Sequence, residues 1–173
     1  MKYAKHIGVS AALLVSLFVS EGYLETAARP VPGDVCTEGF GSTKGVKCGD
    51  KTDPVKAAVR AYTELERDYA EPIRKCLGDT PVSEGQFNAL VKLAYRVGAP
   101  TVCGTAKPGK PAKLIDLFKA GNNAAGCERI KEFNCGPSGM PGVTVDKCGP
   151  GKKILRGLIN RAETEYQMCI GGK

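Results

Sequence analysis

The stretch Ser20-Glu21-Gly22-Tyr23 and the later run Thr37-Glu38-Gly39-Phe40-Gly41-Ser42-Thr43 decide how this chain folds. The first stretch places an acidic residue at the foot of an apolar segment. The second combines glycines with β-branched residues, which is typical of short strands joined by tight turns. We therefore expect a β-hairpin over residues 33–46, closed by a disulfide between Cys36 and Cys48. Helices and further disulfides are expected to hold these two pieces in register.

The composition places the chain among exported globular proteins. It has 173 residues, of which 42% are hydrophobic and 25% charged, enough for one compact domain behind an apolar leader. It contains eight cysteines, no CxxC motif and a single histidine, His6, which lies in the leader. These features disfavour a zinc site and favour disulfides formed in an oxidising compartment. We expect no cofactor and no metal.

The formal net charge of +7 predicts attraction to something anionic. Disulfides argue against an intracellular partner, so nucleic acid is not expected. A bacterial envelope, with anionic wall polymers and lipid head groups, fits both the charge and the compartment. A basic surface that is merely solvated remains the alternative.

The leader begins with Lys2 and Lys5 and continues without a charge over the fourteen residues 7–20. This apolar run is shorter than the ~20 residues of a transmembrane helix, and a basic start before a short apolar region is typical of a secretory signal. The best cleavage site, at Thr26-Ala27-Ala28, would remove Glu21. Either the leader is cleaved, or it is retained as a weak anchor that can leave the membrane. Its small and hydroxylated residues favour retention, which would place Glu21 on the last turn of a helix.

Helix signals dominate the rest of the chain. Asp53 as N-cap and Pro54 at the first helical position predict a helix of about 24 residues. Its expected buried stripe is Val55, Ala58, Val59, Tyr62, Leu65, Tyr69, Ile73 and Leu77. The run Ser83-Glu84-Gly85-Gln86 is a capping box that opens a second helix, ended by Gly98 and Pro100.

Shorter helices are expected over residues 112–120 and from Asn122 or Asn123 to Ile130. A loop over residues 135–151 precedes a last helix over about 152–170. The order is an apolar helix, a small hairpin and then helices, which indicates an α+β fold that is mostly helical. A cleft between a small β lobe and a helical lobe would suit an extended polymer.

Several motifs of this chain resemble those of a known protein family. Glu21-Gly22, a stretch ending in Gly33, and Thr37-Glu38-Gly39-Phe40-Gly41-Ser42-Thr43 resemble the signature of the phage lysozyme family of endolysins, glycoside hydrolase family twenty-four. The similarity continues through Phe87-x-x-Leu90-Val91-x-Leu93-Ala94-Tyr95-x-Val97-Gly98 and Gly126-Cys127 to Gly157-Leu158-x-x-Arg161-x-Glu163-x-Glu165. The leader resembles the signal-anchor-release segments of one endolysin branch. The chain departs from the family at Arg96, where relatives often carry an amide.

The resemblance implies a muramidase that hydrolyses the β-1,4 bond between N-acetylmuramic acid and N-acetylglucosamine in peptidoglycan. It makes Glu21 the catalytic acid, and Thr37 the residue that positions the attacking water. The family's aspartate has no counterpart here, since Pro30 and Val31 occupy the expected places. Asp34 is then the candidate base or electrostatic partner, with a purely turn-forming role as its alternative. Glu25 and Glu38 are weaker candidates.

The resemblance also implies binding partners, a cellular location and a domain organisation. Bacterial peptidoglycan is the expected partner, with transient contact to the inner membrane through residues 7–20 and a monomeric enzyme in the host periplasm. Residues 1–20 would be the signal-anchor-release segment, and residues 21–173 the catalytic domain. Alternative functions are a lytic transglycosylase and an inactive, disulfide-rich wall-binding protein.

Eight cysteines allow on the order of a hundred pairings. A disulfide between Cys135 and Cys148 would close a short loop, as the one between Cys36 and Cys48 would. The resemblance suggests Cys76–Cys169 and Cys103–Cys127 for the remaining four.

Overall fold

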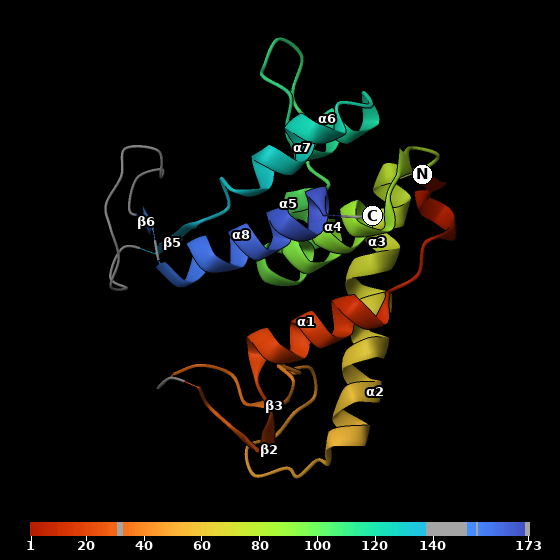
Figure 1. The fold of residues 1–173 in the computed structure, drawn as a ribbon. Coiled ribbons are helices and arrows are strands. Elements are labelled where there is room, and N and C mark those ends of the chain that lie inside the picture. Colours follow the sequence, from red (N-terminus) through yellow and green to blue (C-terminus); the bar gives the residue numbers. More distant parts are fainter. Residues whose placement is uncertain (31–32, 138–151, 155, 172–173) are drawn as a thin grey trace. The chain divides into compact units, whose positions relative to one another are not determined.

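A computed structural model describes residues 1–30, 33–137, 152–154 and 156–171 (Figure 1). The chain divides into two compact units. The first, here called the hairpin unit, is Gly8–Ala70. The second, the helical unit, combines Met1–Ile7 with Glu71–Lys173. Among the described residues, no helix combines the length and the hydropathy needed to cross a membrane.

The hairpin unit begins with helix α1 (Ala11–Glu21), which is capped by the Ser10 side chain. Strand β2 (Leu24–Ala28) follows and pairs antiparallel with β3 (Thr37–Gly39). The predicted hairpin over residues 33–46 was therefore wrong about the partner of β3. Within that range only an isolated bridge between Glu38 and Ser42 forms. The main partner of β3 is β2, which follows α1 in the sequence.

Residues 54–77 are helical, as predicted, and comprise α2 (Pro54–Glu64), a π-helical segment η2 (Leu65–Ala70) and α3 (Glu71–Leu77). The predicted N-cap is also confirmed, since the Asp53 carboxylate accepts hydrogen bonds from the backbone N–H groups of Val55 and Lys56. The local signals at the start of this helix were sufficient to place it.

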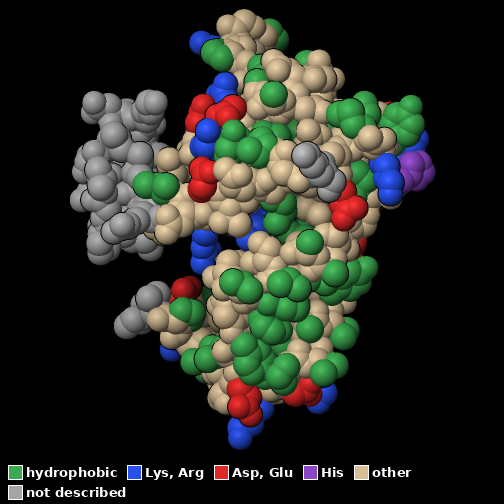
Figure 2. Space-filling view, in the orientation of Figure 1, with side chains coloured by type: hydrophobic (Ala, Val, Ile, Leu, Met, Phe, Trp, Pro, Cys, Tyr) green, Lys and Arg blue, Asp and Glu red, His purple; other side chains and the backbone are tan. Residues whose placement is uncertain are grey.

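The first half of the predicted buried stripe on α2 was wrong. Val55 and Val59 are 72% and 62% exposed, whereas Ala57 and Ala61 are buried. The reason is the close approach of β3, because a Cβ added to Gly39 would lie 2.8 Å from the Cβ of Ala57. Only small side chains fit between the two backbones, so the larger valines face outward. Figure 2 shows apolar side chains gathered on the surface over α1 and α2.

The helical unit includes the first seven residues of the chain. Strand β1 (Lys2–Tyr3) pairs antiparallel with β4 (Pro81–Val82), and a 3-10 turn η1 (Ala4–His6) follows it. The Arg74 guanidinium donates to the carbonyl of Ile7 at 2.8 Å, and the Lys5 ammonium lies 2.6 Å from an Asp79 carboxylate oxygen. Ala4 and Ile7 are buried.

The core of the helical unit is built around α4 (Glu84–Val97), which packs against α8 (Arg156–Ile170). The predicted capping box is confirmed, because Ser83 Oγ accepts from Gln86 N and Gln86 Oε1 accepts from Ser83 N. Helix α4 ends at Gly98, whose φ of 86° favours glycine.

Shorter elements complete this unit: α5 (Ala99–Val102), α6 (Leu114–Lys119), α7 (Asn123–Ile130), β5 (Cys135–Pro137) and β6 (Lys152–Ile154). The last helix begins at Arg156 instead of about residue 152, because residues 152–154 form β6 and pair with β5. Within α8, Ala162 and Cys169 are buried as predicted, whereas Ile159 is 42% exposed.

Three disulfides link described residues: Cys36–Cys48, Cys76–Cys103 and Cys127–Cys169. The first was predicted correctly. The expected pairs Cys76–Cys169 and Cys103–Cys127 were wrong, because α3 packs against α5 and α7 packs against α8. The Cα atoms of the observed pairs are 5.7 and 5.6 Å apart, within the usual range for a disulfide. The predicted pair Cys135–Cys148 involves Cys148, which lies outside the described residues.

Candidate active site

Glu21 is the last residue of α1, and its side chain is exposed. The helix ends there because Gly22 has a φ of 74° and donates its N–H to the carbonyl of Phe18 at 3.0 Å. Glycine adopts this backbone conformation without strain. The Glu-Gly pair therefore places a carboxyl group at a sharp turn that leads directly into β2.

An aromatic cluster fastens the end of α1 to the turn that follows β3. The rings of Phe18 and Phe40 are stacked with their centroids 3.9 Å apart, and the Tyr23 ring lies 5.4 Å from Phe40. The Tyr23 hydroxyl donates to the carbonyl of Thr52 at 3.0 Å. Desolvation, together with the charges of Glu25 and Asp53, raises the pKa of Tyr23. The cluster thus positions the helix end that carries Glu21.

Thr37 opens β3 and lies opposite Ala28, the last residue of β2. Its hydroxyl donates to the carbonyl of Val35 at 3.4 Å, and its side chain is half-buried. Strand β2 begins three residues after Glu21, at Leu24, which lies opposite Gly39, and it ends opposite Thr37. Glu21 therefore precedes the start of β2, and Thr37 pairs with its end.

Asp34 is exposed in the connection before β3. Its Oδ1 atom accepts a hydrogen bond from the backbone N–H of Val35 at 2.8 Å. This is the local, turn-forming contact that the sequence left open as the alternative for Asp34. Glu25 is exposed, and within the described ranges no group of three His, Cys, Asp or Glu side chains could hold a metal ion.

Sequence reasoning missed Arg60, which organises the turn after Thr37. Its guanidinium lies 2.6 Å from Glu38 Oε1 and 2.9 Å from Glu64 Oε1, and it also donates to the carbonyl of Lys44. The Ser42 hydroxyl donates to Glu64 Oε2 at 2.7 Å. Glu38 is only 7% exposed, so it faces α2 rather than a substrate. The i,i+4 spacing of Arg60 and Glu64 was a visible signal, but the contact with Glu38 depends on the fold.

A carboxyl group at a helix end and a hydroxyl on the adjoining hairpin suit glycosidic cleavage. Such cleavage needs a carboxylic acid to protonate the leaving oxygen, and a group that directs water to the sugar carbon. Glu21 at the end of α1 and Thr37 on β3 carry side chains of these two kinds within one unit.

Comparison with known proteins identifies the family of the chain. Residues 19–165 match the family model described as phage lysozyme. The chain is 30% identical over 164 residues to a SAR-endolysin of Pseudomonas phage phiKMV, covering 92% of this chain and 87% of the relative. It is also 30% identical over 151 residues to a SAR-endolysin of Haemophilus phage HP1, covering 81% and 69% of the two chains.

Solved structures agree on the fold. An endolysin from Escherichia coli O157:H7 phage FAHEc1 matches with a TM-score of 0.75 and 24% identity, over 95% of this chain and 94% of that one. The muramidase domain of SpmX from Asticaccaulis excentricus matches with a TM-score of 0.76 and 16% identity, over 95% and 99%. Because the family model matches residues 19–165, which is most of the sequence, the chain belongs to the phage lysozyme family and is a glycoside hydrolase.

Proposed function

We propose that this protein is an endolysin that hydrolyses the β-1,4 bond between N-acetylmuramic acid and N-acetylglucosamine in host peptidoglycan. The observation that carries the proposal is the Phe18–Phe40 stack, which ties the helix end bearing Glu21 to the hairpin bearing Thr37. The name SAR-endolysin, shared by two relatives at 30% identity, supports a role in lysis. The net charge of +7 suits an anionic wall polymer.

The proposed chemistry divides the reaction between three side chains. Glu21 protonates the glycosidic oxygen, and the Thr37 hydroxyl orients a water molecule toward the anomeric carbon. Asp34 acts as base or electrostatic partner. Its Oδ1 atom holds the Val35 N–H, so the carboxylate is fixed in orientation while its exposed side faces solvent. The enzyme acts as a monomer, and nucleic acid is not among its partners.

We further propose that residues 1–20 form a signal-anchor-release segment and residues 21–173 the catalytic domain. Residues 7–20 would tether the enzyme to the inner membrane, facing the host periplasm. In the folded protein, Leu13 and Leu17 of this segment are buried and Phe18 stacks on Phe40. While the segment lies in a bilayer this stack cannot form, and Glu21 is kept away from Thr37. Release from the membrane would then complete the site.

The direct test compares Glu21→Gln with wild type on purified peptidoglycan. A lost general acid lowers the rate by about a hundredfold or more. Glu84→Gln is the control, because Glu84 is also exposed and is not among the candidate catalytic residues. Equal clearing by Glu21→Gln and wild type would refute the assignment of Glu21.

Mass spectrometry of the products identifies the reaction. A reducing end on the released fragments indicates hydrolysis, whereas an anhydro-muramyl end would indicate a transglycosylase. Wall binding by the wild type without release of soluble fragments would mean that the protein is a binding module.

A further inference from the structure

The disulfide between Cys36 and Cys48 lies directly beside Thr37 in the chain. Cys36 is the residue before Thr37, and its Cα atom lies 5.2 Å from that of Cys48. Cys36 is half-buried and Cys48 is exposed, and residues 33–35 are exposed as well. Burial in a core therefore does little to hold the segment that leads into Thr37, and the covalent link is its main restraint.

Both segments that the disulfide joins are also attached to the end of β2. Thr37, next to the first cysteine, lies opposite Ala28. Gly49, next to the second cysteine, donates its N–H to the carbonyl of Ala27 at 2.8 Å. The strand end, the two attached segments and the disulfide thus form a closed ring. A displacement of the segment before Thr37 has to stretch this ring.

The noncovalent contacts of Thr37 restrain it less firmly. Strand β3 has only three residues, and its register with β2 is irregular between Leu24 and Ala28. The hydrogen bond from the Thr37 hydroxyl to the carbonyl of Val35 is 3.4 Å long, beyond the usual range for two oxygen atoms. Because Val35 and Thr37 flank the first cysteine, the direction of the hydroxyl depends on how that cysteine is held.

We propose that Cys36 and Cys48 are positioning residues for the hydrolysis, because their disulfide keeps the Thr37 hydroxyl directed at the attacking water. The inference rests on the proposed function, in which Thr37 orients that water. A misplacement of about 1 Å in a group that positions a reactant can slow a reaction by about a hundredfold. The disulfide therefore acts on kcat, in addition to its contribution to stability.

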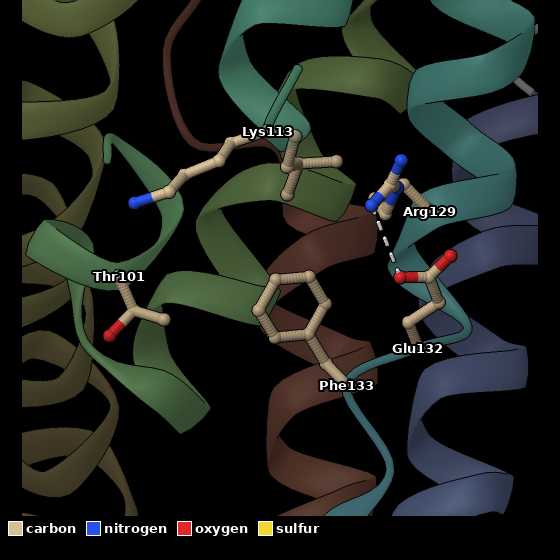
Figure 3. A pocket seen from close by; sticks show the side chains of 6 residues that line it. Thr101, Lys113, Arg129, Glu132 and Phe133 are labelled. Carbon is tan, nitrogen blue, oxygen red and sulfur yellow. Dashed lines mark ion pairs between the residues drawn. The ribbon is translucent and has the colours of Figure 1, made fainter. Parts of the chain in front are cut away.

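The pocket of the helical unit is separate from this disulfide. It has a volume of about 330 Å³, and in Figure 3 the Phe133 ring lies between Lys113 and the Arg129–Glu132 ion pair. All its lining residues belong to the helical unit: Thr101, Lys113, Leu114, Arg129, Glu132 and Phe133. Removal of the disulfide changes none of them, so we expect its effect within the hairpin unit.

The test is a double-mutant cycle on the release of reducing ends from solubilised peptidoglycan strands. Replacing Cys36 and Cys48 by alanine should lower kcat about tenfold and change KM by less than about twofold, since no contact with the substrate is removed. Thr37→Val removes the hydroxyl, keeps the branched side chain and should lower kcat at least as far. In the Thr37→Val background, loss of the disulfide should have little further effect on kcat, because the disulfide acts through the hydroxyl.

The matched control replaces Cys127 and Cys169 by alanine. This pair closes a longer loop, with a sequence separation of 42 against 12, so its loss should destabilise the protein at least as much. At a temperature where all variants are folded, its kcat should stay within about twofold of wild type. An equal fall of kcat in this control would overturn the proposal.

The outcomes separate the inference from the proposed function. If wild type releases no reducing ends, or if Thr37→Val is as active as wild type, the proposed function fails at that point. If Thr37→Val is impaired while loss of the Cys36–Cys48 disulfide leaves kcat unchanged, the inference alone fails. It also fails if the two losses are fully additive, since the disulfide would then act independently of the hydroxyl.

A second measurement uses the wild-type chain and does not depend on how the variants fold. Cys127 and Cys169 are 1% and 2% exposed, so brief treatment with dithiothreitol should reduce the accessible Cys36–Cys48 bond before theirs. The two thiols of the reagent become a cyclic disulfide as the two cysteine thiols form. Alkylation and peptide mapping show which bonds are open. We expect kcat to fall with the fraction of Cys36–Cys48 reduced and to return on reoxidation. Full activity with this bond open would overturn the proposal.

Discussion

The guanidinium of Arg96 and the carboxylate of Glu165 form a two-point ion pair, with Nε to Oε1 at 3.1 Å and Nη2 to Oε2 at 2.7 Å. Their side chains are only 9% and 1% exposed, so the pair is buried between α4 and α8. Arg96 also donates to the carbonyl of Phe133. The arginine that departs from the family's usual amide therefore has a structural partner in this chain.

Removing one member of this pair should destabilise the protein strongly. Arg96→Gln leaves the Glu165 carboxylate buried without its cation, and we expect a loss of about 3 kcal/mol in the free energy of unfolding. The double variant Arg96→Met with Glu165→Leu should recover most of this loss. Urea unfolding with the disulfides intact provides the measurement. If the single variant were as stable as wild type, the pair would not be a structural link.

Removing Arg60 should loosen the turn that follows Thr37. Arg60→Met leaves the buried Glu38 carboxylate without its ion-pair partner, and we expect about 2 kcal/mol of destabilisation. We also expect a lower kcat on peptidoglycan, because the turn is then held less firmly beside Thr37. Lys44→Met is the control. Arg60 contacts the carbonyl of Lys44, not its side chain, so this variant should behave like wild type. Similar losses in both variants would contradict the assignment to Arg60.

The disulfide pairing can be checked by peptide mapping of the unreduced protein, which should give Cys76–Cys103 and Cys127–Cys169. Replacing Cys127 and Cys169 by alanine opens a loop with a sequence separation of 42, and the chain-entropy estimate is a loss of about 4 kcal/mol. Replacing Cys36 and Cys48, with a separation of 12, should cost about 3 kcal/mol. Guanidinium unfolding measures both. Recovery of a Cys76–Cys169 peptide would contradict this arrangement.

The charge of Asp53 should stabilise the start of α2 in a pH-dependent way. The backbone N–H of Lys56, followed by the Lys56 ammonium, lowers the pKa of Asp53 below its ordinary value of 3.8. Since the folded-state pKa is the lower one, the stabilisation is complete above 3.8 and is lost as pH falls through the folded-state value. Wild type should therefore be more stable than Asp53→Asn at neutral pH, and the difference should disappear as pH falls through the folded-state pKa of Asp53. A difference that persists in acid would rule out the charge as its source.

Local signals in the sequence predicted those features that depend on neighbouring residues. The cap at Asp53 and the box at Ser83 and Gln86 are satisfied within one turn of a helix, so their residues identify them directly. Glu21 and Thr37 were assigned because the glycine-containing motifs around them resemble those of the phage lysozyme family. Whether these side chains catalyse the reaction stays a prediction.

Features that depend on long-range packing could not be predicted. Helix α2 has one apolar face with Val55 and Val59 and another with Ala57 and Ala61, and periodicity alone favours the larger side chains. The close approach of Gly39 selects the alanines instead. Likewise, the pairing of Cys76 with Cys103 follows from the packing of α3 against α5, and the ion pair of Arg60 with Glu38 joins two elements that are separate in the sequence.

The pairing of β1 with β4 also determines the order in which the protein can assemble. The hairpin unit is one continuous segment, Gly8–Ala70, and it is inserted in the sequence of the helical unit. The helical unit therefore combines Met1–Ile7, before this insertion, with the residues that follow it. During synthesis the whole hairpin unit therefore leaves the ribosome before Pro81 and Val82 can receive Lys2 and Tyr3. Lys2 and Tyr3 are therefore among the first residues translated, but their strand pairing cannot form until residues 81 and 82 have been synthesised.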